Sequence, residues 1–493
     1  MKIENNKYKF KDRDFFLKLF GENVYAVGGF VRDLFLGKVR DDVDLLIVKE
    51  DIDSIIEKLK PHGKVDVVGK NFGIVLFTKD GINYEIALPR IDIADTSKRA
   101  DHKNFIVKAD PNLPIEKDLE RRDFVCNSMA LHLKSGELID PFGGVKDIEK
   151  KILRMTNEKS FFDDPLRILR AARFASTLEF ELDGKIYPKA NETDLTGLSM
   201  ERITEEFFKM IIRSKKPSIG FWEYFKLGVL KQLFPELFKL TLTIQDSKFH
   251  PETDEQGHHT VWAHTMLVVD NASFLAKNER FDFDETERLI LILGALFHDI
   301  GKISTTEWNW KRGRMTITSN NHDFVGEKIV ENIFKRFNII KYKGYKMKEL
   351  VKRMVRFHHR IHDLWKNREF ISKKSVARIY LEFKDDIKYL LILDISDKEG
   401  RGQGIPATLD ERGEWFLEMI DKYELNKETI NPLIMGRDLI ALGMKPGPAM
   451  GEVLKELYEL QLEDRFKTKE EGLEFAKKYI KDYIFSEETN ENQ

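Results

Sequence analysis

Two glycines and two aspartates near the start of the chain are the first residues whose types and spacing could do chemistry. Gly28 and Gly29 precede Arg32, and Asp42 and Asp44 follow shortly after. Because glycines lack a Cβ, backbone N–H groups there can approach a triphosphate, and a helix N-terminus favours negative charge. The Arg32 guanidinium could clamp phosphate oxygens. Aspartates two apart on a strand share a face, which predicts an oxygen-ligand site for divalent ions that assist nucleotidyl transfer.

Short strands and glycine turns must position these residues. Runs of β-branched and aromatic residues, broken by Gly, Asp and Lys, predict strands at 24–28, 43–48, 65–68, 74–78 and 84–88. After Phe162, apolar residues recur at three and four positions, which predicts helices. We therefore expect an α+β head over 1–150, followed by an all-α neck over 151–245, a histidine-rich region over 246–405 and a tail over 406–493.

The segment from Gly28 to Asp44 resembles the class II tRNA nucleotidyltransferase and bacterial poly(A) polymerase family, within the DNA polymerase beta superfamily. The resemblance implies a polymerase-beta-like head with magnesium at Asp42 and Asp44, and Glu85 is a candidate third metal carboxylate. It also implies that 91–119 holds a flexible loop that helps to switch specificity from C to A. The nucleotide-binding residues implied in the head are Gly28, Gly29, Arg32, Asp33, Arg121, Arg122, Asp123 and Asn127.

A later motif, Asp163 to Arg167, is similar to the one with which this family reads the incoming base. Cytosine and adenine present an amine donor beside a ring-nitrogen acceptor, whereas uracil and guanine present the reverse order. Asp164 would accept from the amine and Arg167 would donate to the ring nitrogen, with a helix placing both on one face. Arg170 and Arg173 extend this nucleotide-binding set; the alternative is that Arg167, Arg170 and Arg173 only form surface ion pairs.

The region 246–405 holds nine of the 12 histidines. The order His, His-Asp, His, His, Asp resembles the HD phosphohydrolase superfamily, which implies one or two divalent metals. Imidazole and carboxylate ligands suit manganese, nickel, cobalt, iron or magnesium. The implied ligands are His264, His298, Asp299, His322, His358 and Asp397, with His359 and Asp394 as alternatives to the last two. Lys302 could contact a phosphate, whereas His250, His258, His259 and His362 are interpreted as loop or surface residues.

Bulk properties limit the class of protein. The longest apolar stretch, 289–297, is too short to cross a bilayer, and the single cysteine excludes an internal disulfide framework. We expect a cytoplasmic protein with no membrane contact. The net charge of −2 means that any RNA binding must use local basic patches, the clearest being 335–360.

These observations favour template-independent addition of CCA to the tRNA 3′ end from CTP and ATP, with a second, metal-dependent phosphohydrolase site. A poly(A) polymerase, an enzyme adding only CC or only A, and an HD phosphohydrolase with a nucleotide-binding head are the alternatives. The glycine-rich stretch 436–451 is either a tRNA contact or a helical packing element. The oligomeric state is open.

Overall fold

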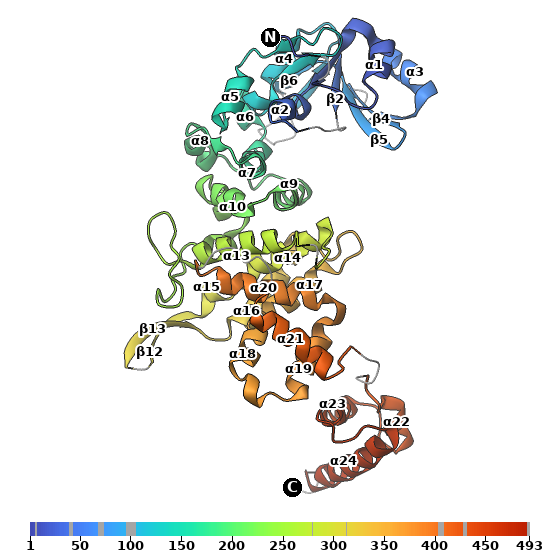
Figure 1. Ribbon diagram of the computed structural model, residues 1–493, viewed down its shortest axis with the longest axis vertical. Helices are drawn as coiled ribbons and strands as arrows, with labels where there is room; N and C mark the ends of the chain where they lie inside the picture. The colour runs from blue at the N-terminus through green and yellow to red at the C-terminus, as the bar shows by residue number, and fades with distance from the viewer. Residues whose placement is uncertain are drawn as a thin grey trace. The chain divides into compact units, whose positions relative to one another are not determined.

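The computed structural model describes residues 1–493 except 5–6, 39–42, 68–72, 95–104, 279, 312, 403–408, 427–430 and 491–493. The chain forms two compact units, Met1–Phe238 and Lys239–Gln493 (Figure 1). Over the described ranges, no helix is both long and apolar enough to pass through a membrane.

A seven-stranded sheet forms the core of the head. Its strand order is β3 (Lys64–Val67), β4 (Ile74–Lys79), β5 (Ile82–Ala87), β2 (Asp44–Ile47), β1 (Val24–Val27), β8 (Ala130–His132) and β9 (Leu138–Ile139). The five strands that the sequence predicted are confirmed, and β8 and β9 extend the sheet beyond them. Strands β2 and β5 pair in parallel, whereas the other neighbours are antiparallel.

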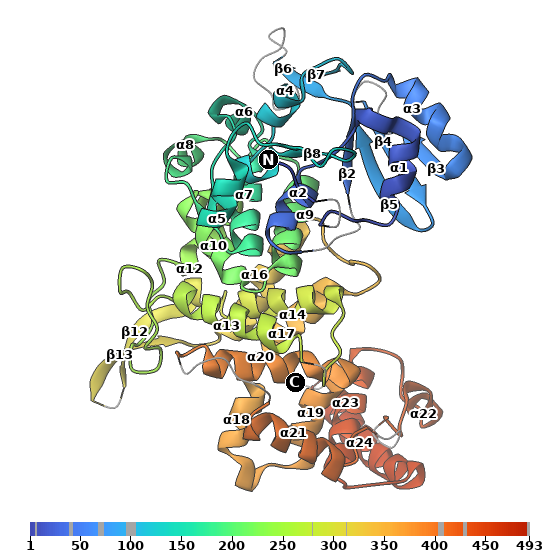
Figure 2. The ribbon, with the colours of Figure 1, turned by 45° about the horizontal axis from the view of Figure 1, so that its top comes forward.

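Helices flank this sheet in Figure 2. They are α1 (Arg13–Phe20), α2 (Gly29–Phe35), α3 (Ile52–Leu59), α4 (Ile115–Glu120) and α5 (Gly144–Lys150). The segment 91–119, where a flexible loop was expected, contains a hairpin of β6 (Arg90–Ala94) and β7 (Phe105–Ala109), followed by α4. Only 95–104 of that segment lies outside the described residues.

The rest of the first unit is helical, as predicted. Its elements are α6 (Glu158–Asp163), α7 (Leu166–Leu178), α8 (Ile186–Glu192), α9 (Met200–Arg213), α10 (Pro217–Lys226), α11 (Val229–Leu233) and α12 (Pro235–Leu240), with a two-stranded sheet of β10 (Ile152–Leu153) and β11 (Glu181–Leu182). Helix α7 packs against α9 and α10. Leu169 and Ala172 on its apolar side are fully buried. Because one side of the helix is buried, apolar residues recur every three or four positions, and this spacing predicted the helix correctly.

The second unit is built around α14 (Glu285–Phe297), whose residues Leu289 to Phe297 are all buried. Helices α13 (Val261–Leu275), α17 (Met347–Phe357) and α20 (Ile387–Glu399) pack against it. The other helices of this region are α15 (Lys302–Thr305), α16 (His322–Arg336), α18 (Arg360–Lys366), α19 (Lys373–Phe383) and α21 (Glu411–Lys422). A hairpin of β12 (Thr306–Lys311) and β13 (Arg314–Ser319) departs from the all-α expectation, because Trp, Ile and Thr alternate with polar residues there.

The C-terminal helices are α22 (Gly436–Ala441), α23 (Pro448–Leu462) and α24 (Lys469–Asn490). They bury Leu439, Leu457 and Ala476 in a small apolar cluster. Of the two readings of 436–451, these contacts support a helical packing element.

Candidate nucleotide site and candidate metal centre

Gly28 lies at the junction of β1 and α2, where only glycine fits. Its φ of +70° belongs to the left-handed region. A Cβ added to Gly28 would stand 2.9 Å from Arg122 Nη1 and 3.6 Å from Asp44 Oδ2. The strand-to-helix turn therefore brings the Gly28 backbone, a guanidinium and a carboxylate together at one point of the head.

Asp44 and Glu85 form a carboxylate pair beside that turn. They are partners in the parallel register of β2 and β5. Both are exposed, whereas the next pair, Leu45 and Ile86, is buried. Since side chains alternate between the faces of a sheet and these two residues are register partners, the two carboxylates lie on the same face, and such oxygens suit magnesium. Asp42 falls in 39–42, outside the described residues.

Arg32 has partners other than the phosphate oxygens that the sequence suggested. Its guanidinium is only 4% exposed. Nη1 donates to Asn127 Oδ1 at 2.7 Å, and Nε and Nη2 donate to Asp33 Oδ1 at 2.9 and 2.8 Å. Arg32 is thus held by contacts within the head, to Asp33 and to Asn127 of the predicted nucleotide-binding set.

A chain of polar contacts continues from Asn127 into the neck. Asn127 Nδ2 donates to Asp123 Oδ1 at 3.1 Å, and Arg170 donates to Asp123 Oδ2 at 2.9 and 2.5 Å. Burial alone would raise the pKa of Asp123, but the charge of Arg170 and these hydrogen bonds hold it well below its usual range. Arg173 Nε pairs with Glu206 Oε2 at 2.6 Å. Arg170 and Arg173 therefore form ion pairs, as the alternative reading held, although these pairs are largely buried.

Arg121 and Arg122 share one buried acid. Arg121 Nη2 lies 2.9 Å from Asp118 Oδ1, and Arg122 Nη2 lies 3.1 Å from Asp118 Oδ2. Burial would raise the pKa of Asp118, but the two guanidinium charges lower it. This pairing fixes both guanidinium groups, and that of Arg122 lies beside the Gly28 turn.

Asp164 and Arg167 lie near the start of α7, but only Arg167 is within the helix, so the two residues do not share a helix face. Asp164 lies in the turn before the helix, because the following Pro165 disfavours helical geometry at the preceding residue. The helical placement predicted for Asp164 is wrong. Its carboxylate accepts from Arg202 Nη2 at 3.1 and 3.2 Å. Arg167 donates to the Arg121 carbonyl at 2.7 Å and to Ser160 Oγ at 3.0 Å.

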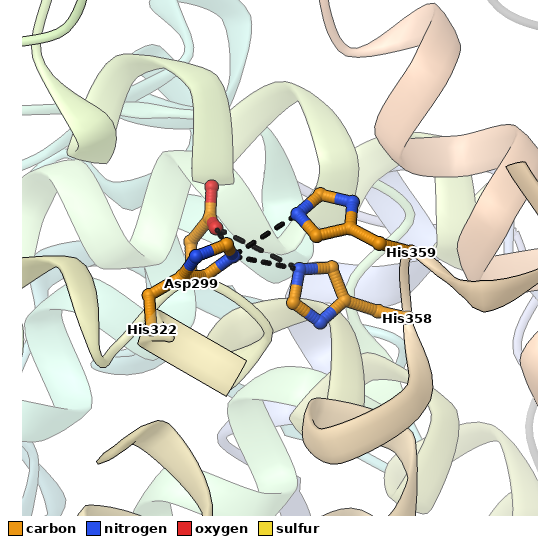
Figure 3. Close-up of side chains that lie close together, drawn as sticks. All are labelled: Asp299, His322, His358 and His359. Carbon is orange, nitrogen blue, oxygen red and sulfur yellow. Dashed lines mark hydrogen bonds and ion pairs between the residues drawn. The ribbon is translucent and has the colours of Figure 1, made fainter. Parts of the chain in front are cut away.

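The predicted HD ligands gather from separate helices of the second unit. His264 comes from α13, His298 and Asp299 follow α14, His322 begins α16, His358 follows α17, and Asp397 lies in α20. His264, His298 and His358 are fully buried, and Asp299 is 2% exposed. Figure 3 shows Asp299, His322, His358 and His359 pointing toward one another. His359, the alternative to His358, joins the group together with it.

Three imidazoles are oriented in the same way. Each Nδ1 lies 2.7 Å from the carbonyl oxygen three residues earlier; the pairs are His298 with Ala295, His322 with Ser319 and His358 with Val355. A donating Nδ1–H leaves the lone pair on Nε2. His322 Nε2 faces His358 Nε2 at 3.3 Å and His359 Nε2 at 3.0 Å. If Nδ1 of His322 and of His358 carries the proton, their Nε2 lone pairs face one another, and this donor set fits a metal ion between them.

Unpaired atoms at the centre also fit a metal. Among the described residues, the buried atoms His298 Nε2 and Asp299 Oδ1 have no hydrogen-bond partner. Asp299 Oδ1 lies 3.3 Å from His322 Nε2 and 3.8 Å from His358 Nε2. His264 Nε2 lies 2.9 Å from Asp397 Oδ1.

Two neighbouring charged residues have protein partners that the sequence did not predict. Asp394, the alternative to Asp397, pairs with Arg412 at 3.1 Å, and burial raises its pKa to about 7. Lys302, expected near a phosphate, is 8% exposed. It donates to Asp299 Oδ2 at 2.7 Å and to Gln245 Oε1 at 2.7 Å. Burial would raise the pKa of Asp299, but Lys302 and His298 hold it well below its usual range.

Glu252 and His250 are site residues that the sequence reading missed. Glu252 Oε1 lies 3.0 Å from both His264 Nδ1 and His250 Nδ1. Glu252 Oε2 is buried without a hydrogen-bond partner among the described residues. His250 lies in a loop, as interpreted, and its ring packs edge-on against that of His264. Both precede α13 in a segment without regular structure, so no periodicity could identify them.

We expect Glu252→Gln to weaken metal binding about 10- to 100-fold, the usual effect of losing a carboxylate that orients a histidine ligand. Competitive titration of the full chain with a chelator and Mn²⁺ measures this affinity. Glu255→Gln, on an exposed residue of the same segment, is the matched control. Equal affinities for the two variants would show that Glu252 does not orient His264.

Comparisons with known proteins agree with both sites. Family models match at 24–154 (Poly A polymerase head domain), 189–240 (probable RNA and SrmB-binding site of polymerase A) and 261–400 (HD domain). Both domains are of kinds that bind divalent metals. The multifunctional CCA protein of Xanthomonas campestris pv. campestris strain B100 is 30% identical over 442 residues, covering 87% of this chain and 96% of the relative. That of Stenotrophomonas maltophilia strain K279a is 29% identical, with coverages of 87% and 97%.

Solved structures share the fold along nearly the whole chain. The Bacillus stearothermophilus CCA-adding enzyme in complex with CTP has a TM-score of 0.60 and 20% identity, covering 95% of this chain and 96% of that one. The Thermotoga maritima enzyme complexed with tRNA has a TM-score of 0.55 and 21% identity, with 97% of both chains covered. The resemblance drawn from the motifs is confirmed, and the chain belongs to the family of multifunctional CCA proteins, the class II tRNA nucleotidyltransferases that carry an HD domain.

Proposed function

We propose that the protein adds CCA to the 3′ end of tRNA from CTP and ATP without a template. The observation that carries the proposal is the register that places Asp44 beside Glu85, next to the Gly28 turn and Arg122. Relatives that match almost from end to end are named CCA proteins, and solved neighbours hold CTP or tRNA.

The reaction joins the RNA 3′-oxygen to the α-phosphorus of the nucleotide and breaks the bond to the pyrophosphate oxygen. Asp44 and Glu85, together with Asp42, would hold magnesium, which supplies charge neutralisation for the attacking and leaving oxygens. Arg122, fixed by Asp118, places a positive charge beside the turn where the triphosphate lies. The hydrogen bond from Arg32 to Asn127 links the helix that follows that turn to the predicted nucleotide-binding set.

Selection of C and A rests on Asp164 and Arg167. Asp164 would accept a hydrogen bond from the exocyclic amine, and Arg167 would donate to the ring nitrogen. Arg202 holds the carboxylate, and the Arg121 carbonyl and Ser160 hold the guanidinium. Uracil and guanine would place an acceptor against Asp164 and a donor against Arg167, which leaves both groups mismatched.

The second site would act as a phosphohydrolase on a phosphate ester such as a 2′,3′-cyclic phosphate end. Its residues would hold manganese, nickel, cobalt, iron or magnesium, which supplies Lewis-acid chemistry for ester hydrolysis. The Nδ1 hydrogen bonds of His298, His322 and His358 fix the donor atoms in advance. Lys302 neutralises part of the Asp299 charge beside them. We propose that the head, neck, HD region and tail meet at residues 150, 245 and 405. The expected compartment is the cytoplasm.

One assay tests the proposed addition. The protein is incubated with tRNAs that end before C74, before C75 and before A76, plus single labelled nucleotides, and the products are sequenced. Completion of CCA followed by a stop is the expected result. Unlimited A tracts would instead identify a poly(A) polymerase. Incorporation of only CC or only A would identify a partial enzyme. No incorporation would show that the head only binds nucleotides.

A further inference from the structure

Two rows of opposite charge join α19 to the C-terminal helices. The basic row, on α19, consists of Lys373, Lys374 and Arg378, and the acidic row, at the end of α23, consists of Glu459, Glu463 and Asp464. Lys374 Nζ lies 2.6 Å from Glu459 Oε2 and 2.7 Å from Glu463 Oε1. Arg378 also pairs with Glu459, and Lys373 Nζ lies 2.9 Å from Asp464 Oδ1. Every member of one row therefore has a partner in the other.

The apolar packing of the C-terminal helices is internal to them. Leu439 and Leu457 belong to their apolar cluster, and all its buried members and the hydrophobic side chains packed against them lie between residues 433 and 480. Helix α19 buries its apolar residues elsewhere in the unit, where the ring of Phe383 packs on that of Phe357. The two rows therefore lie between two separate apolar cores, and their ion pairs connect these cores.

The charges of each row are unfavourable for the helix that carries them. Lys373 and Lys374 stand in the first turn of α19, beside the positive end of its dipole. Glu459 and Glu463 stand at the end of α23, beside the negative end of its dipole. Pairing of the rows offsets both effects, so these charges suit the partner helix and not their own.

Water and salt reach these ion pairs. The side chains of Arg378 and Asp464 are 57% and 45% exposed. Hydrogen bonds from Arg378 and Lys374 lower the pKa of Glu459, and those to Glu459 and Glu463 raise the pKa of Lys374, so both groups are charged at neutral pH. Because exposed ion pairs are weak and screened by salt, other ions compete with them. A polyanion offers the basic row the same charge as the acidic row does.

We propose that the acidic row is an autoinhibitory contact, which covers the basic row in the free protein and leaves it when RNA phosphates bind there. The inference rests on the proposed function for the identity of the polyanion, because tRNA is the substrate of that function. The net charge of −2 gives the chain no general attraction for RNA. The basic row adds three positive charges to the RNA-binding surface only after the acidic row has left it.

Two variants of the full chain break the same ion pairs from opposite sides. Glu459→Gln/Glu463→Gln leaves the cations uncovered, whereas Lys374→Gln/Arg378→Gln removes two of them. The dissociation constant for tRNA, measured by fluorescence anisotropy at about 0.1 M salt, is expected to fall about 10-fold in the first variant and to rise about threefold in the second. Changes in the same direction would show that the ion pairs only position the C-terminal helices, and would overturn the proposal.

The matched control changes two acids that are outside the contact. Glu470→Gln/Glu474→Gln alters exposed residues of α24 and changes the net charge by the same amount as the first variant. This control is expected to keep the wild-type dissociation constant. A fall equal to that of Glu459→Gln/Glu463→Gln would assign the effect to net charge alone and contradict the proposal.

Energy transfer between two dyes measures the opening directly. The dyes are attached to the full chain at Lys366→Cys on α18 and Lys478→Cys on α24, and the native Cys126 is buried. Transfer efficiency is expected to fall when tRNA is added, and to be low without RNA in labelled Glu459→Gln/Glu463→Gln. An efficiency that tRNA leaves unchanged would overturn the proposal. Neither measurement needs nucleotide incorporation, so a failure of CCA addition is detected separately from a failure of this contact to open.

Discussion

Asp44→Asn is expected to lower nucleotide incorporation into tRNA by about 10³-fold or more. The neutral amide keeps the size of the side chain but removes one of the two carboxylates that β2 and β5 present together. Metal-borne neutralisation of transition-state charge contributes several kcal/mol, and each 1.4 kcal/mol or so is tenfold in rate. Single-turnover incorporation of labelled CMP and AMP measures the effect.

Asp66→Asn is the matched control for Asp44, because it changes an exposed aspartate on β3 of the same sheet. The control is expected to incorporate nucleotides at the wild-type rate, and hydrolysis at the HD site should be the same in both variants. If Asp44→Asn retains a tenth or more of the activity, the head binds its metal through other residues.

Asp299→Asn is expected to abolish hydrolysis at the HD site, with a loss of about 10³-fold or more, while CCA addition continues. Asp299 is the acid that lies nearest to His298, His322 and His358 together. Its replacement removes a negative charge and an oxygen ligand from a site with several imidazoles. Metal content of the purified chain, measured by mass spectrometry, should fall with the activity.

Asp394→Asn separates a ligand from a buried aspartate of the same region. Asp394 lies one turn before Asp397 on α20 but pairs with Arg412. This variant should keep its metal even if its melting temperature falls. Loss of metal in Asp394→Asn, or full hydrolysis in Asp299→Asn, would show that the ligand set is misassigned.

Local patterns in the sequence predicted much of this structure. The alternation around Val24, Ile74 and Tyr84 and the helical spacing after Phe162 depend on neighbouring residues only, and both are confirmed. The order of the histidines predicted which of these side chains lie close together in the second unit. Each of them lies on a helix or at the end of one. Family resemblance then supplied the chemistry that such a group performs.

The sequence could not predict contacts whose two partners are distant along the chain. Arg32 was interpreted as a phosphate ligand, and nothing near it in the sequence points to Asn127, 95 residues away. Glu252 gains its position from His264 on α13, and it carries no motif of its own. Asp164 was placed on a helix although Pro165 follows it, and this error was avoidable from local sterics alone.

One series of polar contacts limits how this sequence can evolve. It runs from Arg32 through Asn127, Asp123 and Arg170 to Glu206. A lone charge reversal at Glu206 leaves the buried Arg173 without its ion-pair partner, at a cost of about 3–5 kcal/mol. Substitutions at these positions of the head and the neck are therefore expected to be correlated in evolution, with both partners of a pair replaced together.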